Sequence, residues 1–119
     1  MKKQNVNPEQ NYIAANFDVY PVFENLIREK YRSGLYIRII SPQKDQQFSI
    51  YASILFSWES KLYESLKIII LNNKAELIVE IKDVVDNTVI FNKKLQPGLY
   101  YWKLETENDL VYLGKFVIK

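Results

Sequence analysis

The chain has 119 residues, of which 48% are hydrophobic and 25% charged, and its formal net charge is +2. A chain of this size and composition can form one compact domain with a buried core. Histidine and cysteine are both absent, which excludes disulfides, thiolate nucleophiles, zinc sites built from Cys and His, and an imidazole general base. No segment is strongly basic, so nucleic acid is not an expected partner.

The N-terminal segment, residues 1–19, is polar and rich in Asn and Gln, which predicts a flexible linker or tail. Lys2 and Lys3 are not followed by the apolar stretch of a signal peptide, and no apolar run in the chain is long enough to span a membrane. Two alternatives stay open. The protein is cytoplasmic, or an N-terminal leader or membrane tether has been removed and is absent from this chain.

Residues 20–34 have the pattern of a short amphipathic helix. Pro21 is typical of a first helical turn, and Gly34 is typical of the position just after the end of a helix. Apolar residues recur at helical spacing and form one stripe: Val22, Phe23, Leu26, Ile27 and Tyr31. Because a helix of this length is marginal alone, its stripe must dock on its own domain or on another molecule.

Residues 35–119 have the pattern of a β-sandwich domain. Turn signals such as Asn72-Asn73, Asp86-Asn87 and Pro97-Gly98 separate short runs of alternating or continuous apolar residues. Seven strands are predicted: 35–42, 53–59, 65–71, 75–82, 88–95, 99–105 and 111–119. With no helical pattern between them, these strands predict an all-β, antiparallel sandwich.

The stretch "LYYWKLE" raises the question of whether its aromatic residues form a binding platform or a core. Alternation places Tyr100, Trp102 and Leu104 on one face of the strand and the charged residues on the other. The uncharged face is predicted to point into the core, with Trp58 facing it from the other sheet. These aromatic side chains are therefore interpreted as structural.

Four stretches, "ILFSW", "LKIIIL", "LQPGLYYWKLE" and "YLGKFVIK", resemble the fibronectin type III and immunoglobulin-like modules, most closely those in envelope proteins of Bacteroidetes-type bacteria. The resemblance implies that Trp58 is a core residue of strand B. It also implies a tyrosine corner formed by Leu95, Pro97, Gly98 and a following tyrosine. The family spacing favours Tyr101 as the corner residue, whereas the inward alternation favours Tyr100.

The resemblance also bears on location. The stretch "FENLIREKYRS…ISP" is similar to the segment that joins a membrane anchor to such a module, which implies a periplasmic or cell-envelope location. In the lettering of the family, residues 65–71, 99–105 and 111–119 are strands C, F and G of one sheet.

The outward side of these three strands, which we call the C–F–G face, is unusually apolar. Its residues are Lys67, Ile69, Leu71, Tyr101, Lys103, Leu113, Lys115 and Val117. An apolar patch of this kind is normally covered. The predicted helix, a second copy of the chain, or a partner protein or glycan anchored at Tyr101 could each cover it.

No other motif predicts chemistry. Glu76 and Glu80 are interpreted as solubilising residues of one strand, and Asp83, Asp86 and Asn87 lack the glycine and spacing of a calcium loop. We therefore expect no catalytic residues, no cofactor and no metal. The sequence predicts a non-catalytic interaction or structural module of an envelope protein. We expect another protein or a second copy to bind its C–F–G face; the alternative is a carbohydrate-binding accessory module.

Overall fold

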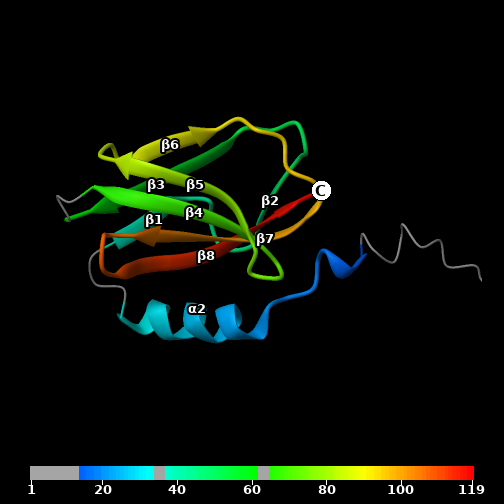
Figure 1. The fold of residues 1–119 in the computed structure, drawn as a ribbon, viewed down its shortest axis with the longest axis horizontal. Helices are drawn as coiled ribbons and strands as arrows, with labels where there is room; N and C mark the ends of the chain where they lie inside the picture. The colour runs from blue at the N-terminus through cyan, green and yellow to red at the C-terminus, as the bar shows by residue number, and fades with distance from the viewer. Residues whose placement is uncertain (1–13, 34–36, 62–64) are drawn as a thin grey trace, which may run out of the picture.

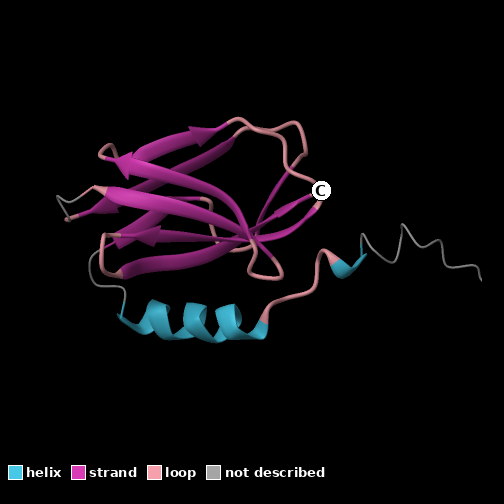
Figure 2. Cartoon of the chain, in the orientation of Figure 1, coloured by secondary structure: helices cyan, strands magenta, loops and turns pink. Residues whose placement is uncertain are grey.

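The computed structural model describes residues 14–33, 37–61 and 65–119, and it places one helix against a two-layered β-structure (Figures 1 and 2). The elements in chain order are α2 (Pro21–Ser33), β1 (Ile37–Ser41), β2 (Gln46–Phe48), β3 (Ile54–Ser60), β4 (Leu66–Asn72), β5 (Leu77–Val84), β6 (Thr88–Phe91), β7 (Gly98–Glu105) and β8 (Leu110–Ile118).

The strands form two sheets, one with the order β1-β3-β6 and one with the order β2-β8-β7-β4-β5. In the family lettering these are strands A-B-E and G-F-C-C′, with β2 added beside G. The predicted fold class, an immunoglobulin or fibronectin III-like sandwich preceded by a short helix, is confirmed. All seven predicted strands are present, and β4, β7 and β8 lie side by side as expected for C, F and G.

Strand β2 was not predicted. It has three residues and runs parallel to β8, with Gln46 opposite Phe116 and Phe48 opposite Ile118. The stretch is short and polar, so its own residues carry no strand signal. It becomes a strand because the chain crosses from one sheet to the other after Pro42 and pairs with the edge of β8 that is not occupied by β7. The sandwich is therefore antiparallel except at this pair.

The core between the sheets contains both tryptophans. Trp58 is 2% exposed and Trp102 is 0% exposed, on strands of opposite sheets, and the ring of Phe56 lies 4.9 Å from that of Trp102. Tyr100 and Leu104 belong to the same buried cluster. The predicted inward face of "LYYWKLE" is confirmed, and its aromatic residues on that face fill the core.

The tyrosine corner is formed by Tyr100. Its hydroxyl donates a 2.7 Å hydrogen bond to the carbonyl oxygen of Gln96, four residues upstream, as the motif requires. Tyr101 points to the opposite side of the sheet. The alternation of side chains therefore identified the corner residue, and the family spacing did not.

Strand β5 departs from the alternation expected for it. Leu77 was expected to face inward with Val79 and Ile81, but Leu77 is 61% exposed. The pairing of β5 with β4 shifts at both ends of the strand, and Asp83 has a φ of 58° within the second irregularity. A β-bulge inserts a residue and interrupts alternation, which explains why neighbouring Leu77 and Ile78 are both exposed.

The segment before α2 is attached to the sandwich. The amide of Asn73 donates hydrogen bonds to the carbonyl oxygens of Ala15 and Asp18, at 2.8 and 2.9 Å, and Leu99 N–H donates to Asn16. Residues 14–18 were expected to belong to a flexible tail, but these bonds hold them against the β4–β5 turn and the beginning of β7; residues 1–13 lie outside the described residues. Within the described ranges, no helix has the length and apolarity needed to cross a membrane.

Candidate functional site: the C–F–G face and the hollow beside it

Helix α2 lies across the C–F–G face (Figure 1). Leu71, Tyr101 and Leu113 are buried beneath it in one cluster with Phe23 and Ile27. Ile69 and Val117, the other apolar residues of the face, are half-buried at the edge of this cluster, and Leu99, which the sequence analysis did not name, belongs to it. Of the three covers expected from the sequence, the structure shows the first: the helix of the same chain covers the C–F–G face. The expectation that Tyr101 is an exposed anchor is wrong, because it is 0% exposed.

The apolar stripe of α2 is narrower than predicted. Phe23 and Ile27 are four positions apart and both are 7% exposed, whereas Val22 is 57% exposed. One residue of helix turns the side chain by about 100°, so Val22 points away from the sheet. The Phe23 ring packs edge-on against Tyr101 at 5.0 Å. The side chain of Tyr31, which was also predicted in the stripe, lies outside the described residues.

A polar network fixes the beginning of α2 on the same face. The Tyr101 hydroxyl accepts a 2.9 Å hydrogen bond from the Tyr20 N–H and donates a 2.7 Å hydrogen bond to Glu24 Oε2. Lys115 Nζ donates to Glu24 Oε1 at 2.8 Å and lies 3.6 Å from Asp45 Oδ1. Helix, sheet and the β1–β2 turn are thus joined through charge-assisted contacts at the rim of the apolar cluster.

The network shifts three ionisation equilibria. Burial raises the pKa of Glu24, but hydrogen bonds from Lys115 and Tyr101, with the charges of Lys115 and Arg28, lower it by more. Burial lowers the pKa of Lys115, but its contacts with Glu24 and Asp45 raise it overall. Burial and the neighbouring Glu24 carboxylate raise the pKa of Tyr101 despite the bond from Tyr20. All three shifts favour a charged Glu24, a charged Lys115 and a neutral Tyr101 around neutral pH.

Glu24, the central residue of this network, was not identified from the sequence. Its partners Tyr101 and Lys115 lie 77 and 91 positions away, so no local pattern connects them.

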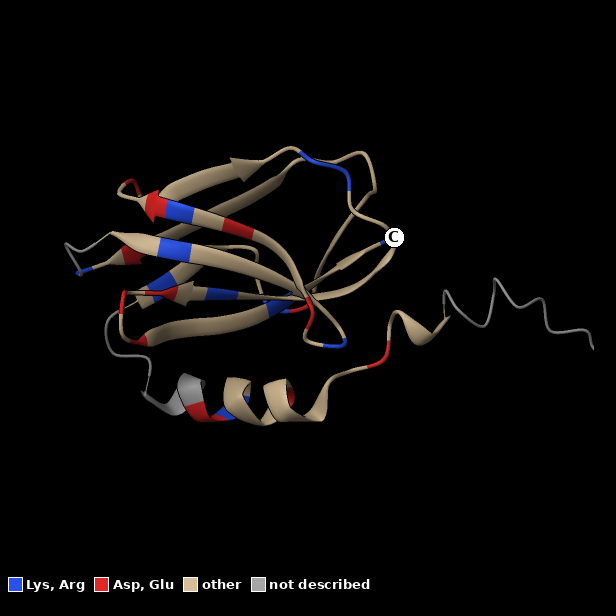
Figure 3. Ribbon diagram, viewed as in Figure 1, with Lys and Arg blue, Asp and Glu red and all other residues tan. Residues whose placement is uncertain are grey.

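The other two lysines of the predicted face have different contacts. Lys67 Nζ lies 3.3 Å from Glu80 and 3.8 Å from Glu105, and Lys103 Nζ lies 5.2 Å from the centre of the Phe23 ring. Figure 3 shows both blue and red segments on the strands, so the side in view carries charges of both signs.

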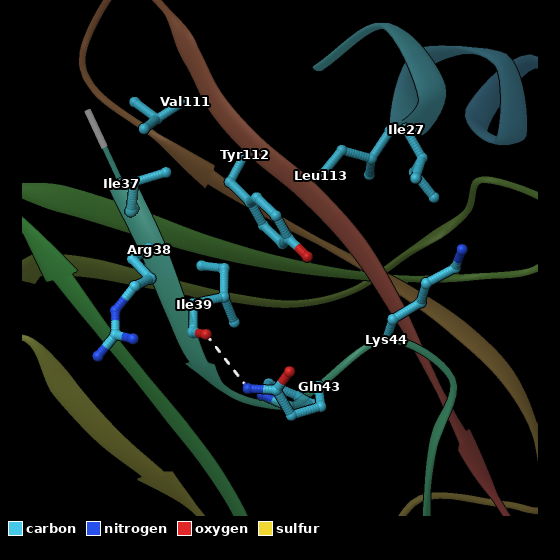
Figure 4. Close-up of a pocket in the computed structure, with 10 residues that line it drawn as sticks. Ile27, Ile37, Arg38, Ile39, Gln43, Lys44, Val111, Tyr112 and Leu113 are labelled. Atoms are coloured by element: carbon cyan, nitrogen blue, oxygen red, sulfur yellow. Dashed lines mark hydrogen bonds between the residues drawn. The ribbon is translucent and has the colours of Figure 1, made fainter. Parts of the chain in front are cut away.

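A hollow opens beside α2, between β1, the β1–β2 turn and the first half of β8 (Figure 4). We call it the β1–β8 hollow; its volume is about 470 Å³. It is lined by Ile27, Ile37, Arg38, Ile39, Pro42, Gln43, Lys44, Val111, Tyr112 and Leu113. A second hollow of about 320 Å³ shares Ile27 and Lys44 with it and is completed by Glu24, Arg28, Asp45, Gly114 and Lys115.

Exposed aromatic residues, which a sugar-binding surface would need, are few among the described residues. Both tryptophans and Tyr101 are buried. Tyr51 is 83% exposed, and Lys94 Nζ lies 5.1 Å from the centre of its ring. Within the described part of the chain, no group of three or more acidic residues is arranged to hold a metal ion.

Comparisons with known proteins give one finding on the fold. No protein-family model and no curated protein matches the chain. Among solved structures, the fibronectin(III)-like modules of CbhA from Clostridium thermocellum are similar, with 20% identity and a TM-score of 0.47. The match covers 70% of this chain and 94% of that chain. The assignment of a fibronectin type III-like fold is carried by the strand order and the tyrosine corner described above.

Proposed function

We propose that this chain is a non-catalytic interaction or structural module of a bacterial envelope protein, and that its C–F–G face is a helix-binding face. Modules of this fold are typically non-catalytic. The observation that carries the proposal is the docking of α2, which buries Phe23 and Ile27 against Tyr101 and Leu113. The envelope location is supported by the sequence resemblance of residues 23–42 to segments that follow membrane anchors.

The energetics favour a docked helix over an autonomous one. An isolated helix of 13 residues is marginal in water, whereas fully burying a Phe or Ile side chain contributes about 1.5–3 kcal/mol. Because the isolated helix is only marginally unstable, two such buried side chains, with the bonds of Glu24 to Tyr101 and Lys115, shift the equilibrium to the docked helix. The face therefore favours a helix that has two apolar residues four positions apart and an acidic residue directly after the first of them.

Two functional consequences follow from this arrangement. First, α2 and the bonded residues 14–18 fix the direction in which the chain enters the sandwich, which suits a rigid connector. Second, a helix of the same pattern from a second copy or another protein can compete for the face when α2 is displaced. Carbohydrate binding has weaker support, because Tyr51 is the single exposed aromatic residue among the described residues and Lys94 already lies over its ring.

The test uses the full chain with Phe23→Asp, which places a charge in the buried cluster. Val22→Asp is the matched control, because it makes the same chemical change on the exposed side of the helix. We expect Phe23→Asp to release α2, measured as fast amide exchange over residues 21–33 with protected strands. A synthetic peptide of residues 14–33 should then bind the variant in trans and not the Val22→Asp protein.

The outcome that contradicts the proposal is a folded Phe23→Asp protein whose α2 is released but which does not bind the peptide. If Phe23→Asp prevents folding, Phe23→Ala serves instead, since it removes the ring without adding a charge. The peptide should then still bind the Phe23→Ala variant, although more weakly than it would bind a variant in which α2 is fully released from the C–F–G face. Absence of any binding by a folded variant with an exchanging α2 would refute helix recognition by the C–F–G face.

A further inference from the structure

The β1–β8 hollow has an apolar interior. Ile37 and Ile39 of β1 face Val111 and Tyr112 of β8, and all four side chains are half-buried (Figure 4). Leu113, nearly completely buried, forms part of the lining nearest α2. The volume of about 470 Å³ is within the range of pockets that hold small organic ligands. The hollow can therefore accept a compact apolar group.

Three basic residues, Arg28, Lys44 and Lys115, and two acidic residues, Glu24 and Asp45, line the smaller, adjoining hollow, and two of the three bases form no ion pair within the described ranges. Lys44, from the β1–β2 turn, has no hydrogen bond or ion pair with any of the described residues. Arg28, from α2, bonds the side-chain carbonyl of Asn25 and has no carboxylate within 4 Å in the described ranges. The other basic residues of the two hollows have acidic partners: Arg38 pairs with Glu59, and Lys115 with Glu24 and Asp45.

The backbone beside the hollow favours a small molecule over a peptide. An extended peptide would dock by hydrogen bonding to the edge of a strand. On β1, the carbonyl oxygens of Ile39 and Ile40 already accept hydrogen bonds from Gln43 Nε2, at 3.2 and 2.7 Å. Figure 4 shows the bond to Ile39 at the mouth of the hollow. What remains available is a surface of side chains, which is mainly apolar in the larger hollow and has one more basic than acidic residue in the smaller.

We propose that the two hollows together bind an amphiphilic carboxylate, with its apolar chain in the β1–β8 hollow and its carboxylate between Arg28 and Lys44. Lys44 lines both hollows and so stands at the junction of chain and head group. Burying the chain supplies the affinity, and the two cations supply selectivity for a negative head group. The site requires α2 in its docked position, because Ile27 and Arg28 of the helix line the hollows, but it does not require a helix from another molecule.

The experiment is a titration of the full chain with dodecanoate below its micellar concentration, followed by backbone amide shifts in NMR spectra. We expect saturable shifts at residues 37–44 and 111–113. Dodecyltrimethylammonium, which has the same chain and a positive head group, should give none at those residues. Lys44→Glu should weaken dodecanoate binding by about tenfold or more, as expected for loss of a charge-assisted contact.

Lys74→Glu is the matched control, because Lys74 is exposed in the β4–β5 turn and its replacement changes the net charge equally. It should leave the dissociation constant unchanged. Equal weakening by both variants, equal binding of the cationic amphiphile, or no saturable shift would overturn the proposal. Shifts centred on the exposed residues Leu55 and Ile90, outside the two hollows, would also overturn it. So would a site that takes a short acidic peptide and not dodecanoate.

Discussion

Replacing Tyr101 by Phe is the most informative perturbation of the helix-to-sheet contact. The ring remains and keeps its packing against Phe23, so the change removes only the hydroxyl. That hydroxyl bonds Tyr20 N–H and Glu24. Tyr100→Phe is the matched comparison in the neighbouring position, because it removes one hydroxyl that makes a 2.7 Å bond to a neutral carbonyl.

The expected magnitudes differ because the bonds differ. A neutral hydrogen bond contributes about 0.5–1.5 kcal/mol and one to a charged group about 1.5–3 kcal/mol. Tyr100→Phe should therefore lower the free energy of unfolding by about 1 kcal/mol. Tyr101→Phe should lower it by about 2–3 kcal/mol, since Glu24 keeps Lys115 as a partner. With an unfolding entropy typical of this length, 1 kcal/mol corresponds to about 4 °C in Tm.

The assay is thermal and urea denaturation of both variants at pH 7, with amide exchange read over α2. Tyr101→Phe should melt about 8–12 °C below the parent protein, about two to three times as far below it as Tyr100→Phe. Its exchange should also accelerate in residues 21–33. A Tyr101→Phe loss equal to or smaller than that of Tyr100→Phe, with unchanged exchange in α2, would refute the reasoning that this hydroxyl fixes the helix.

Two further predictions test the pH dependence and the close packing of β8. The pKa of Glu24 is lowered from 4.5 on folding, so its contribution is present above that pH and is lost as the pH falls through the folded-state value. Urea midpoints of the parent protein and Glu24→Gln should therefore differ at pH 7 and converge as the pH falls below the folded-state pKa of Glu24; a constant difference would contradict this. Gly114→Ala should cost about 1–3 kcal/mol by urea denaturation, because its methyl group would lie 2.6 Å from the Tyr112 ring and 2.9 Å from Trp102 Nε1. Gly98→Ala, whose nearest contact would be 3.1 Å, should cost less, and equal losses would argue against this steric account.

Local patterns determined most of the fold. Short apolar runs between turn signals identified seven of the eight described strands, and alternation in "LYYWKLE" placed Tyr100 and Trp102 in the core. These predictions succeed because the apolar residues of a strand with one buried face recur at every second position. This pattern is visible within the strand itself. The apolar C–F–G face was found in the same way, since its members occupy the opposite positions of the same strands.

Tertiary contacts decided the rest. The sequence left three covers for the C–F–G face, and only the docking of Phe23 and Ile27 selects α2. Strand β2 exists because β8 offers it a partner, and the exposure of Leu77 follows from bulges set by pairing with β4. Glu24 meets Tyr101 and Lys115 across long separations in the chain, where periodicity carries no information. The sequence by itself thus determined which faces are apolar, and the folded arrangement determined what each face contacts, because contacts between distant segments depend on how the layers pack.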